Sequence, residues 1–201
     1  MQFRYTCLGE AVICGDSIME VWDILDKHGE PTGKTVERRR VCLAKGEYHL
    51  VVHIWILGND GRVLIQRRSF SKPLMAGEWA AIGGSAVSGE KAEIAAQREL
   101  AEEMGIEVRL EDLKLIKNMV RKNSILNVFL VCRTIPVAEL KLQEEEVSEA
   151  KWVHRNKLRQ MIKNGEFHNY GKEYFEAIFA AFDKKSATRR RKKRYELRHR
   201  K

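Results

Sequence analysis

The sequence predicts an α/β sandwich, in which helices pack on the faces of a β-sheet. A hairpin pattern lies in the first half of the chain, one strongly periodic helix follows it, and further strands and helices alternate after that helix. Strands interleaved with helices are typical of this layered class. With 201 residues, of which 44% are hydrophobic, the chain is long enough for one substantial core, so we expect a single domain.

The hairpin pattern begins with the apolar run from Leu50 to Leu57. A turn with Asp-Gly chemistry follows at Asn59 to Gly61, and a second run extends from Arg62 to Gln66. After a loop from Ser69 to Gly77, the chain passes through a short apolar segment to the glycine pair Gly83-Gly84. This order predicts two paired strands and a loop that leads into a close backbone approach.

The most regular helical pattern extends from Lys91 to Met104. Every fourth residue from Ala92 onward is apolar, which predicts one buried stripe, and Gly105 is the expected C-terminal stop. The following elements are expected in the order strand, strand, strand, helix, helix, at Leu113 to Arg121, Ile125 to Arg133, Ala150 to His154, Leu158 to Lys163 and Tyr174 to Asp183.

The formal charge of +9 comes almost entirely from the C-terminal tail. Residues 184–201 contain eleven Lys or Arg and one acid, a charge of +10, which leaves −1 for the other 183 residues. A run of like charges repels itself, so we expect this tail to be disordered. Residues 1–18 show no periodicity and form an extension that need not belong to the fold. The domain is therefore expected over residues 19–183, opening with strand, turn and extended chain from Glu20.

No secretion signal or membrane span is expected. The apolar runs are far shorter than the roughly 20 residues that a spanning helix needs, and the N-terminus lacks a basic region followed by a long apolar one. The four cysteines, Cys7, Cys14, Cys42 and Cys132, are scattered without a C-x-x-C pair, so the sequence suggests neither a zinc knuckle nor a disulfide framework. We therefore expect a cytoplasmic protein with reduced thiols and no membrane partner.

Three glutamates on the expected helix indicate a cation site. Glu99, Glu102 and Glu103 stand at i, i+3 and i+4, so their carboxylates fall on one face. Like charges at this spacing destabilise a helix unless a cation lies between them. Oxygen-only ligands favour Mg²⁺ or Mn²⁺. A solvated acidic face is the alternative reading of these three residues alone.

The residues around the glutamates resemble the Nudix box, G-x5-E-x7-R-E-U-x-E-E-x-G-U, where U is aliphatic. Every specified position is filled, by Gly84, Glu90, Arg98, Glu99, Leu100, Glu102, Glu103, Gly105 and Ile106. The motif spans about 23 residues, and the flanking elements agree with the family over roughly residues 20–183. The resemblance implies the Nudix-type α/β/α sandwich with a mixed β-sheet.

The resemblance also implies roles for the box residues. The metal ion, Mg²⁺ or Mn²⁺, would be held by the three glutamates and a backbone carbonyl near Gly84, and one glutamate, with Glu99 and Glu102 as the catalytic candidates, would also activate water. Arg98, assigned to the catalytic set, and Glu90 would form an ion pair that orients the cluster.

Candidate ligands outside the box come from two loops. In the family a further metal ligand often follows the box, and Glu145 in the acidic run Glu144 to Glu146 is our candidate. Arg67, Arg68 and Lys72, after the second hairpin strand, could clamp phosphate oxygens. Solvated surface is the alternative for both groups. Trp55, Phe70 and Trp79 could stack on a base, although large aromatic residues more often belong to a core.

The segment from Glu20 to Lys72 is also similar to the isopentenyl-diphosphate isomerase branch of the superfamily, through Tyr48-His49 and Gln66-Arg67-Arg68. That branch requires a cysteine after the tryptophan and an acidic pair on a later strand. Their places fall here near Ile82, and near Ile125 and Asn127, which transfer no protons. His49, without its companions, is interpreted as structural or substrate-facing.

The prediction is a hydrolase that cleaves a diphosphate linkage in a nucleoside diphosphate derivative or nucleotide by metal-assisted attack of water. The alternatives are an isomerase-like enzyme, an RNA 5′-end pyrophosphohydrolase and a noncatalytic Nudix-fold binding module. The expected partners are a small diphosphate compound and, through the basic tail, nucleic acid. A homodimer is also compatible with the sequence.

Overall fold

The computed structural model describes residues 20–40 and 42–198. A two-stranded sheet, β1 (Val21–Leu25) and β2 (Pro31–Glu37), precedes a seven-stranded sheet and three helices. The expected extension at residues 1–18 lies outside the described residues. Within the described part, no helix has the length and apolar character needed to cross a membrane.

The large sheet is mixed, as the resemblance predicted. Its path is β5-β4-β3-β8-β7, with β6 beside β3 and β9 beside β4. Strand β3 runs parallel to β8, and the other pairs are antiparallel. The strands are β3 (His49–Leu57), β4 (Arg62–Arg68), β5 (Trp79–Ala80), β6 (Ile82–Ser85), β7 (Lys114–Val120), β8 (Ser124–Cys132) and β9 (Val147–His154).

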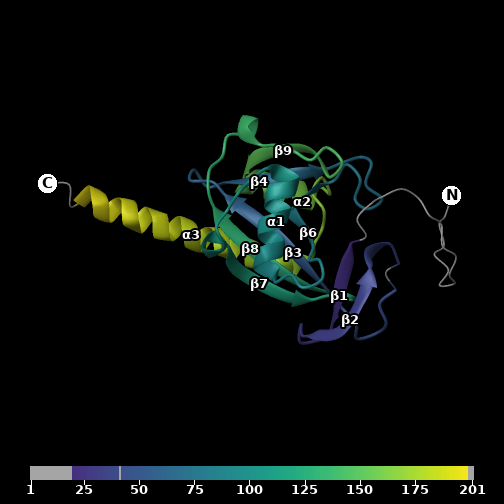
Figure 1. Cartoon of the computed structure of the whole chain (residues 1–201). Helices are drawn as coiled ribbons and strands as arrows, with labels where there is room; N and C mark the ends of the chain where they lie inside the picture. The colour runs from purple at the N-terminus through teal and green to yellow at the C-terminus, as the bar shows by residue number, and fades with distance from the viewer. Residues whose placement is uncertain (1–19, 41, 199–201) are drawn as a thin grey trace.

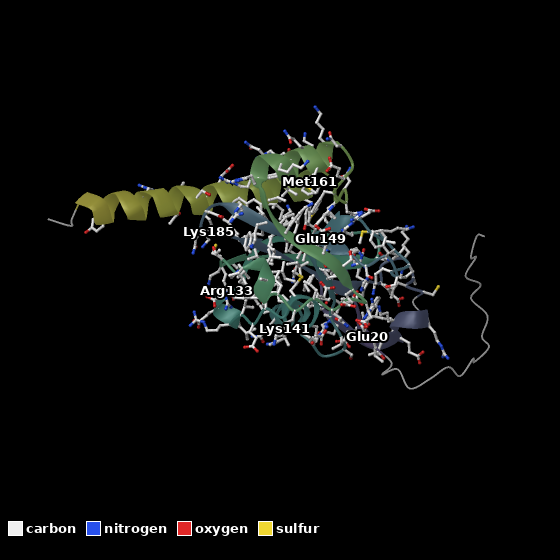
Figure 2. The ribbon with its side chains drawn as sticks, turned by 90° about the horizontal axis from the view of Figure 1, so that it is seen from above. Glu20, Arg133, Lys141, Glu149, Met161 and Lys185 are labelled. Carbon is white, nitrogen blue, oxygen red and sulfur yellow. The ribbon has the colours of Figure 1, made fainter. Side chains whose placement is uncertain are left out.

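Helices cover both faces of this sheet, which confirms the sandwich. Helix α1 (Ala92–Met104) packs on one face, and α2 (Arg155–Lys163) and α3 (Lys172–Arg198) pack on the other (Figures 1 and 2). Because successive side chains of a strand point to opposite faces, Val52 and Ile54 contribute to the α1 core, whereas Trp55 lies in the α2/α3 core.

Each predicted element is present, with small shifts of its ends except at the C-terminal end of α3. The hairpin is β3 and β4, and the periodic helix is α1, which ends at Gly105 with φ 66°. The left-handed conformation is accessible to glycine without a Cβ penalty, so the helix stops there. Three short 3₁₀ turns also occur, at Arg38–Arg40, Leu110–Asp112 and Val137–Glu139.

The expectation of a disordered tail is wrong for residues 184–198, because α3 continues through them to Arg198. The first turns of α3 are fixed by the burial of Tyr174, Ile178 and Phe182. Once a helix is nucleated, each added residue gains a hydrogen bond, and Lys and Arg are good helix formers. Figure 1 shows the C-terminal part of α3 projecting away from the body of the molecule.

Candidate active site

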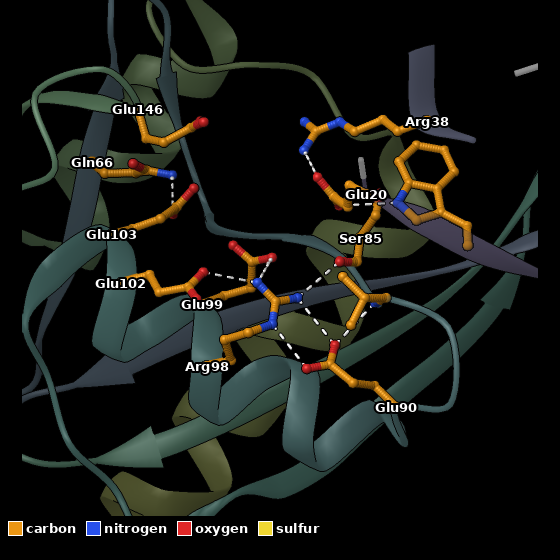
Figure 3. Close-up of polar contacts among 12 residues, drawn as sticks. Glu20, Arg38, Gln66, Ser85, Glu90, Arg98, Glu99, Glu102, Glu103 and Glu146 are labelled. Carbon is orange, nitrogen blue, oxygen red and sulfur yellow. Dashed lines mark hydrogen bonds and ion pairs between the residues drawn. The ribbon is translucent and has the colours of Figure 1, made fainter. Parts of the chain in front are cut away.

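Helix α1 places the three glutamates beside strand β6 of the large sheet. Glu99 and Glu103 are one turn apart and both buried, with 8% and 3% of their surface exposed, while the Glu102 side chain is 54% exposed. The expected common face therefore divides into two carboxylates turned toward the protein and one at the rim. Figure 3 shows this arrangement.

Strand β6 approaches α1 closely at the glycine pair. A Cβ on Gly84 would lie 2.5 Å from Oε1 of Glu99, and a Cβ on Gly83 would overlap the carbonyl of Val52 on β3. Any larger residue at either position would displace its neighbour. The pair thus allows the backbone of β6 and the Glu99 carboxylate to lie side by side.

Arg98 organises the cluster from the solvent side. Its Nε and Nη2 donate to the Glu90 carboxylate at 2.9 and 3.1 Å, Nη1 donates to Glu99 at 3.0 Å and Glu102 at 2.9 Å, and Nη2 also reaches the Ser85 carbonyl at 3.0 Å. These five contacts match the five N–H groups of a guanidinium. The predicted Arg98–Glu90 pair is present, and Arg98 has no N–H group left for a substrate.

Burial makes the two inner glutamates hard to ionise. It raises the pKa of Glu99 to about 7, against the opposing effect of the Arg98 charge. Burial, together with the neighbouring Glu99 and Glu146 carboxylates, raises the pKa of Glu103 to about 8. Gln66 on β4 also donates from Nε2 to Glu103 at 3.3 Å. The cluster therefore favours a positively charged partner.

The glutamates line a cavity of about 170 Å³, which we call the carboxylate cavity. Glu20, Glu146 and Gln143 contribute to its wall, together with Arg38, Arg68 and Arg98. It thus contains five carboxylates and three guanidinium groups, drawn from the ends of the hairpin formed by β1 and β2, which we call the N-terminal hairpin, and from β4, α1 and the segment before β9. Figure 3 shows most of these side chains converging on one space.

The structure brings only part of the predicted phosphate-binding group to this cavity. Arg68 lines it. Arg67 precedes Arg68 on β4, and its side chain points to the opposite face of the sheet. There its Nε donates to the Gly77 carbonyl at 2.9 Å. Lys72 forms an ion pair with Glu146 at 2.6 Å. Alternation along β4 explains why adjacent arginines separate.

The acidic run contributes Glu146, whereas Glu145, our candidate, does not line the cavity. A turn carries the chain into β9, with the Glu146 amide donating to the Gln143 carbonyl and the Ser69 amide donating to the Glu146 carbonyl. This fixes Glu146 beside the loop after β4. Its position next to Val147, the first buried residue of β9, is the sequence signal that could have selected it.

Glu20, Arg38 and Gln143 also line the cavity, although no local sequence pattern marks them as site residues. Glu20 and Arg38 reach the cavity only because the N-terminal hairpin docks against the main domain. Asp23 accepts hydrogen bonds from Ser88 and Gly89 in the loop before α1. Such a contact between distant segments has no local pattern in the sequence.

The three aromatic candidates for stacking on a base lie in different environments. Trp55 is fully buried, and its Nε1 donates to the Tyr174 hydroxyl at 2.8 Å, so it is a core residue and cannot stack on a base. Trp79 is also buried, with Lys151 Nζ 3.6 Å from its ring centroid. Phe70 is 65% exposed, under the Arg67 guanidinium. His49 stacks on Trp22, which supports the structural interpretation.

The positions that matter for isomerase chemistry carry no acid or base. Ile82 is fully buried in the core, Ile125 is also buried, and the Asn127 Oδ1 accepts a hydrogen bond from Asn118. Ile125 and Asn127 border a second cavity of about 490 Å³, which lies between the N-terminal hairpin and the start of α1. This larger cavity adjoins Glu90 but contains none of the three cluster glutamates.

The residues of the carboxylate cavity fit a hard divalent cation. The donor set is oxygen-only, and the missing Cβ of Gly84 leaves backbone next to the Glu99 carboxylate. Among the described residues, no three acidic, histidine or cysteine side chains already surround a common point. Glu99 and Glu102 are instead held by Arg98.

In this α/β/α sandwich, helix α1 carries a glutamate cluster beside strand β6, which contains two adjacent glycines. This combination defines a protein of the Nudix class. The comparison with known families agrees, since the model described as NUDIX domain matches residues 47–175. The chain belongs to the Nudix family, whose hydrolases generally use divalent metal ions.

The relatives include both chemistries considered above. The chain is 35% identical over 153 residues to a Listeria monocytogenes protein named "Uncharacterized Nudix hydrolase lmo0368", covering 76% of this chain and 90% of that one. It is 32% identical to an isopentenyl-diphosphate Delta-isomerase 2 of Photorhabdus laumondii, covering 72% and 83%. The crystal structure of DR0079 from Deinococcus radiodurans matches with a TM-score of 0.64 and 24% identity, over 75% and 93% of the chains, and shows the shared fold.

Proposed function

We propose that this protein hydrolyses a diphosphate linkage in a nucleoside diphosphate derivative or nucleotide, with water attacking phosphorus. The observation that carries the proposal is the carboxylate cavity, where Glu99, Glu102 and Glu103 lie beside Arg68. A diphosphate needs its oxygens neutralised and its attacking water deprotonated. The cavity supplies groups for both tasks.

Glu99, Glu102 and Glu103, with the Gly84 carbonyl, would hold Mg²⁺ or Mn²⁺. When bound, the ion supplies neutralisation of the phosphate oxygens and a lowered pKa for water. Arg98 keeps Glu99 and Glu102 in place through its ion pairs. A cation in the cavity would take over part of the charge compensation that Arg98 now gives.

The remaining roles follow from the side chains themselves. One of the three glutamates would accept the proton of the attacking water; without a bound cation, burial raises the pKa of Glu99 to about 7 and that of Glu103 to about 8. Arg68 is fixed through its Nε, which donates to the Leu74 carbonyl at 3.2 Å. Its terminal nitrogens make no other hydrogen bond within the described part of the chain, so they are available to phosphate oxygens.

A screen of diphosphate compounds tests this function. The purified protein is incubated with nucleoside diphosphates, nucleoside diphosphate sugars and dinucleoside polyphosphates, each with Mg²⁺, Mn²⁺ or a chelator, and released phosphate and phosphomonoesters are measured. We expect turnover of at least one class that stops with the chelator. Binding without turnover across the panel would instead support the noncatalytic module.

RNA with a 5′ cap or triphosphate is a second candidate substrate, favoured by the basic extension of α3. The extension begins near Lys184 and projects from the body of the molecule (Figure 1). A basic helix attracts polyanions without reading their sequence. The same screen therefore includes capped and 5′-triphosphorylated RNA, and hydrolysis of the small compounds alone would exclude this candidate.

A further inference from the structure

The positive charges around the carboxylate cavity are not equally available to a substrate. Arg98 uses all its N–H groups on protein acceptors, and Lys72 is held by Glu146 at 2.6 Å. Arg68 and Arg38 are the two lining guanidinium groups with donors to spare among the described residues. A diphosphate has two phosphoryl groups, which matches the presence of two arginines with unused donors.

Arg38 reaches the cavity from the base of the N-terminal hairpin. It follows β2, and its amide donates to the carbonyl of Glu20, the residue before β1, at 2.9 Å. Both side chains line the carboxylate cavity. In Figure 3, Arg38 and Glu20 lie across the open space from Glu103 and Glu146. The N-terminal hairpin thus supplies one wall of the carboxylate cavity, which the main domain alone would leave open.

The Arg38 guanidinium is positioned but not saturated. Nη1 donates to Glu20 Oε2, while Nε and Nη2 form no hydrogen bond in the part of the chain described. The guanidinium lies 5.8 Å from the Trp22 ring centroid, and Trp22 itself donates to Glu20 Oε1 at 3.0 Å and stacks on His49. Because the Arg38 side chain is 48% exposed, its Nε and Nη2 groups are accessible to the oxygens of a phosphate.

The hairpin is fastened to the loop that precedes α1. The Asp23 carboxylate accepts from the Ser88 hydroxyl at 2.6 Å and the Gly89 amide at 2.8 Å, and the Ser88 amide donates to the Val21 carbonyl at 2.7 Å. These contacts hold Arg38 at a fixed place relative to α1. A preorganised donor loses less freedom on binding than a free surface arginine.

We propose that Arg38 binds the substrate diphosphate opposite Arg68, so that one arginine pairs with each phosphoryl group. The inference rests on the proposed function and adds a substrate-binding residue from outside the matched domain, because the family match begins at residue 47. Glu20 acts as a positioning residue that holds one Arg38 nitrogen. The N-terminal hairpin is therefore part of the active site.

Calorimetric titration with methylenediphosphonate in Mg²⁺ tests this role, since this probe cannot be hydrolysed. Wild type, Arg38→Ala and Arg38→Gln are compared with Arg40→Ala, a control on the same 3₁₀ turn whose Nε pairs with Glu37 at 3.1 Å outside the cavity. Loss of a charge-assisted hydrogen bond predicts at least about tenfold weaker binding for both Arg38 variants. The control should stay within about twofold of wild type.

The outcomes separate this inference from the proposed function. Wild-type affinity in either folded Arg38 variant, with wild type itself binding, would overturn the role of Arg38 and leave the hydrolase intact. No binding by wild type, together with no turnover in the substrate screen, would remove both. Thermal unfolding confirms folding, and Arg38→Gln decides if Arg38→Ala does not fold, because glutamine keeps a shorter but still polar side chain beside Glu20.

Discussion

At the scale of single residues, burial and charge decide what the carboxylate cavity does. Glu103 has 3% of its surface exposed and accepts a hydrogen bond from Gln66, yet among the described residues no arginine forms an ion pair with it. Glu102 lies at the rim in an ion pair with Arg98. The same helix therefore presents carboxylates with different environments, which suits a division between holding a cation and moving a proton.

Replacing Glu102 or Glu103 by Gln tests these two positions. Each substitution keeps the shape and removes a charge and a proton acceptor, so we expect turnover to fall by roughly 10²- to 10⁴-fold while the fold is retained. Initial rates over a range of Mg²⁺ concentrations provide the measurement. Glu107→Gln, at an exposed position outside the cavity, is the control. Near wild-type turnover in both variants would show that the site has been misassigned.

Gly84→Ala tests the close approach of β6 to α1. A Cβ there would lie 2.5 Å from Glu99 Oε1, so the carboxylate has to move, and we expect at least about a tenfold loss of turnover with little change in secondary structure. Gly58→Ala is the matched control, because its Cβ would lie 2.8 Å from the Asp60 carboxylate, far from the cavity. Equal activity of the two variants would contradict a role for the glycine.

At the scale of elements, periodicity made the fold predictable. The four-residue apolar stripe of α1 and the turn residues between β3 and β4 are local signals, and both elements form where they predict. The glutamate cluster was predictable because its members share one helix. Arg38 and Glu20 were not, since they depend on hairpin docking, and the α3 extension was missed because propagation from a packed helix outweighed the repulsion between its charges.

The packing of α3 on the sheet predicts a pH effect on stability. His53 of β3 contacts the Tyr174 hydroxyl through Nδ1 at 3.0 Å, and burial, helped by the Arg121 charge, lowers its pKa to about 3. The unfolded chain, with a His pKa near 6.5, therefore binds the proton first as the pH falls. Stability from neutral His53 is present above pH 6.5 and is lost from there toward pH 3.

Urea unfolding at pH 7 and pH 5 provides the measurement. We expect wild type to lose about 1–2 kcal/mol more than His53→Gln over this interval, because the variant lacks the titrating ring. Other groups titrate in both proteins and cancel in the difference. The same pH dependence in both would show that His53 has an ordinary pKa in the folded state.

At the scale of the whole molecule, the basic extension of α3 and the candidate active site are in separate places. The cavity lies between α1, the sheet and the hairpin, whereas the basic residues gather on the projecting part of α3 (Figures 1 and 3). The main domain is nearly neutral without them. Any attraction to a polyanion should therefore depend on α3 and leave small-substrate chemistry unaffected.

Truncation after Asp183 tests this separation. Buried contacts of α3 up to Phe182 are kept, so we expect kcat and KM for a small diphosphate substrate to stay within about twofold. Binding to a generic RNA, measured by fluorescence anisotropy, should be lost in the truncated chain and fall steeply with salt in the full chain. A large drop in small-substrate turnover would place the extension in the active site instead.

Water attack at phosphorus is the central claim, and an isotope measurement tests it directly. The protein is incubated with Mg²⁺ and a substrate found in the screen, in water enriched in ¹⁸O, and the products are analysed by mass spectrometry. Hydrolysis at phosphorus predicts one ¹⁸O atom in a phosphate-containing product for each turnover, and none in the Glu103→Gln control beyond its residual rate. Product formation with ¹⁸O attached to carbon, or with no ¹⁸O incorporated, would contradict the account.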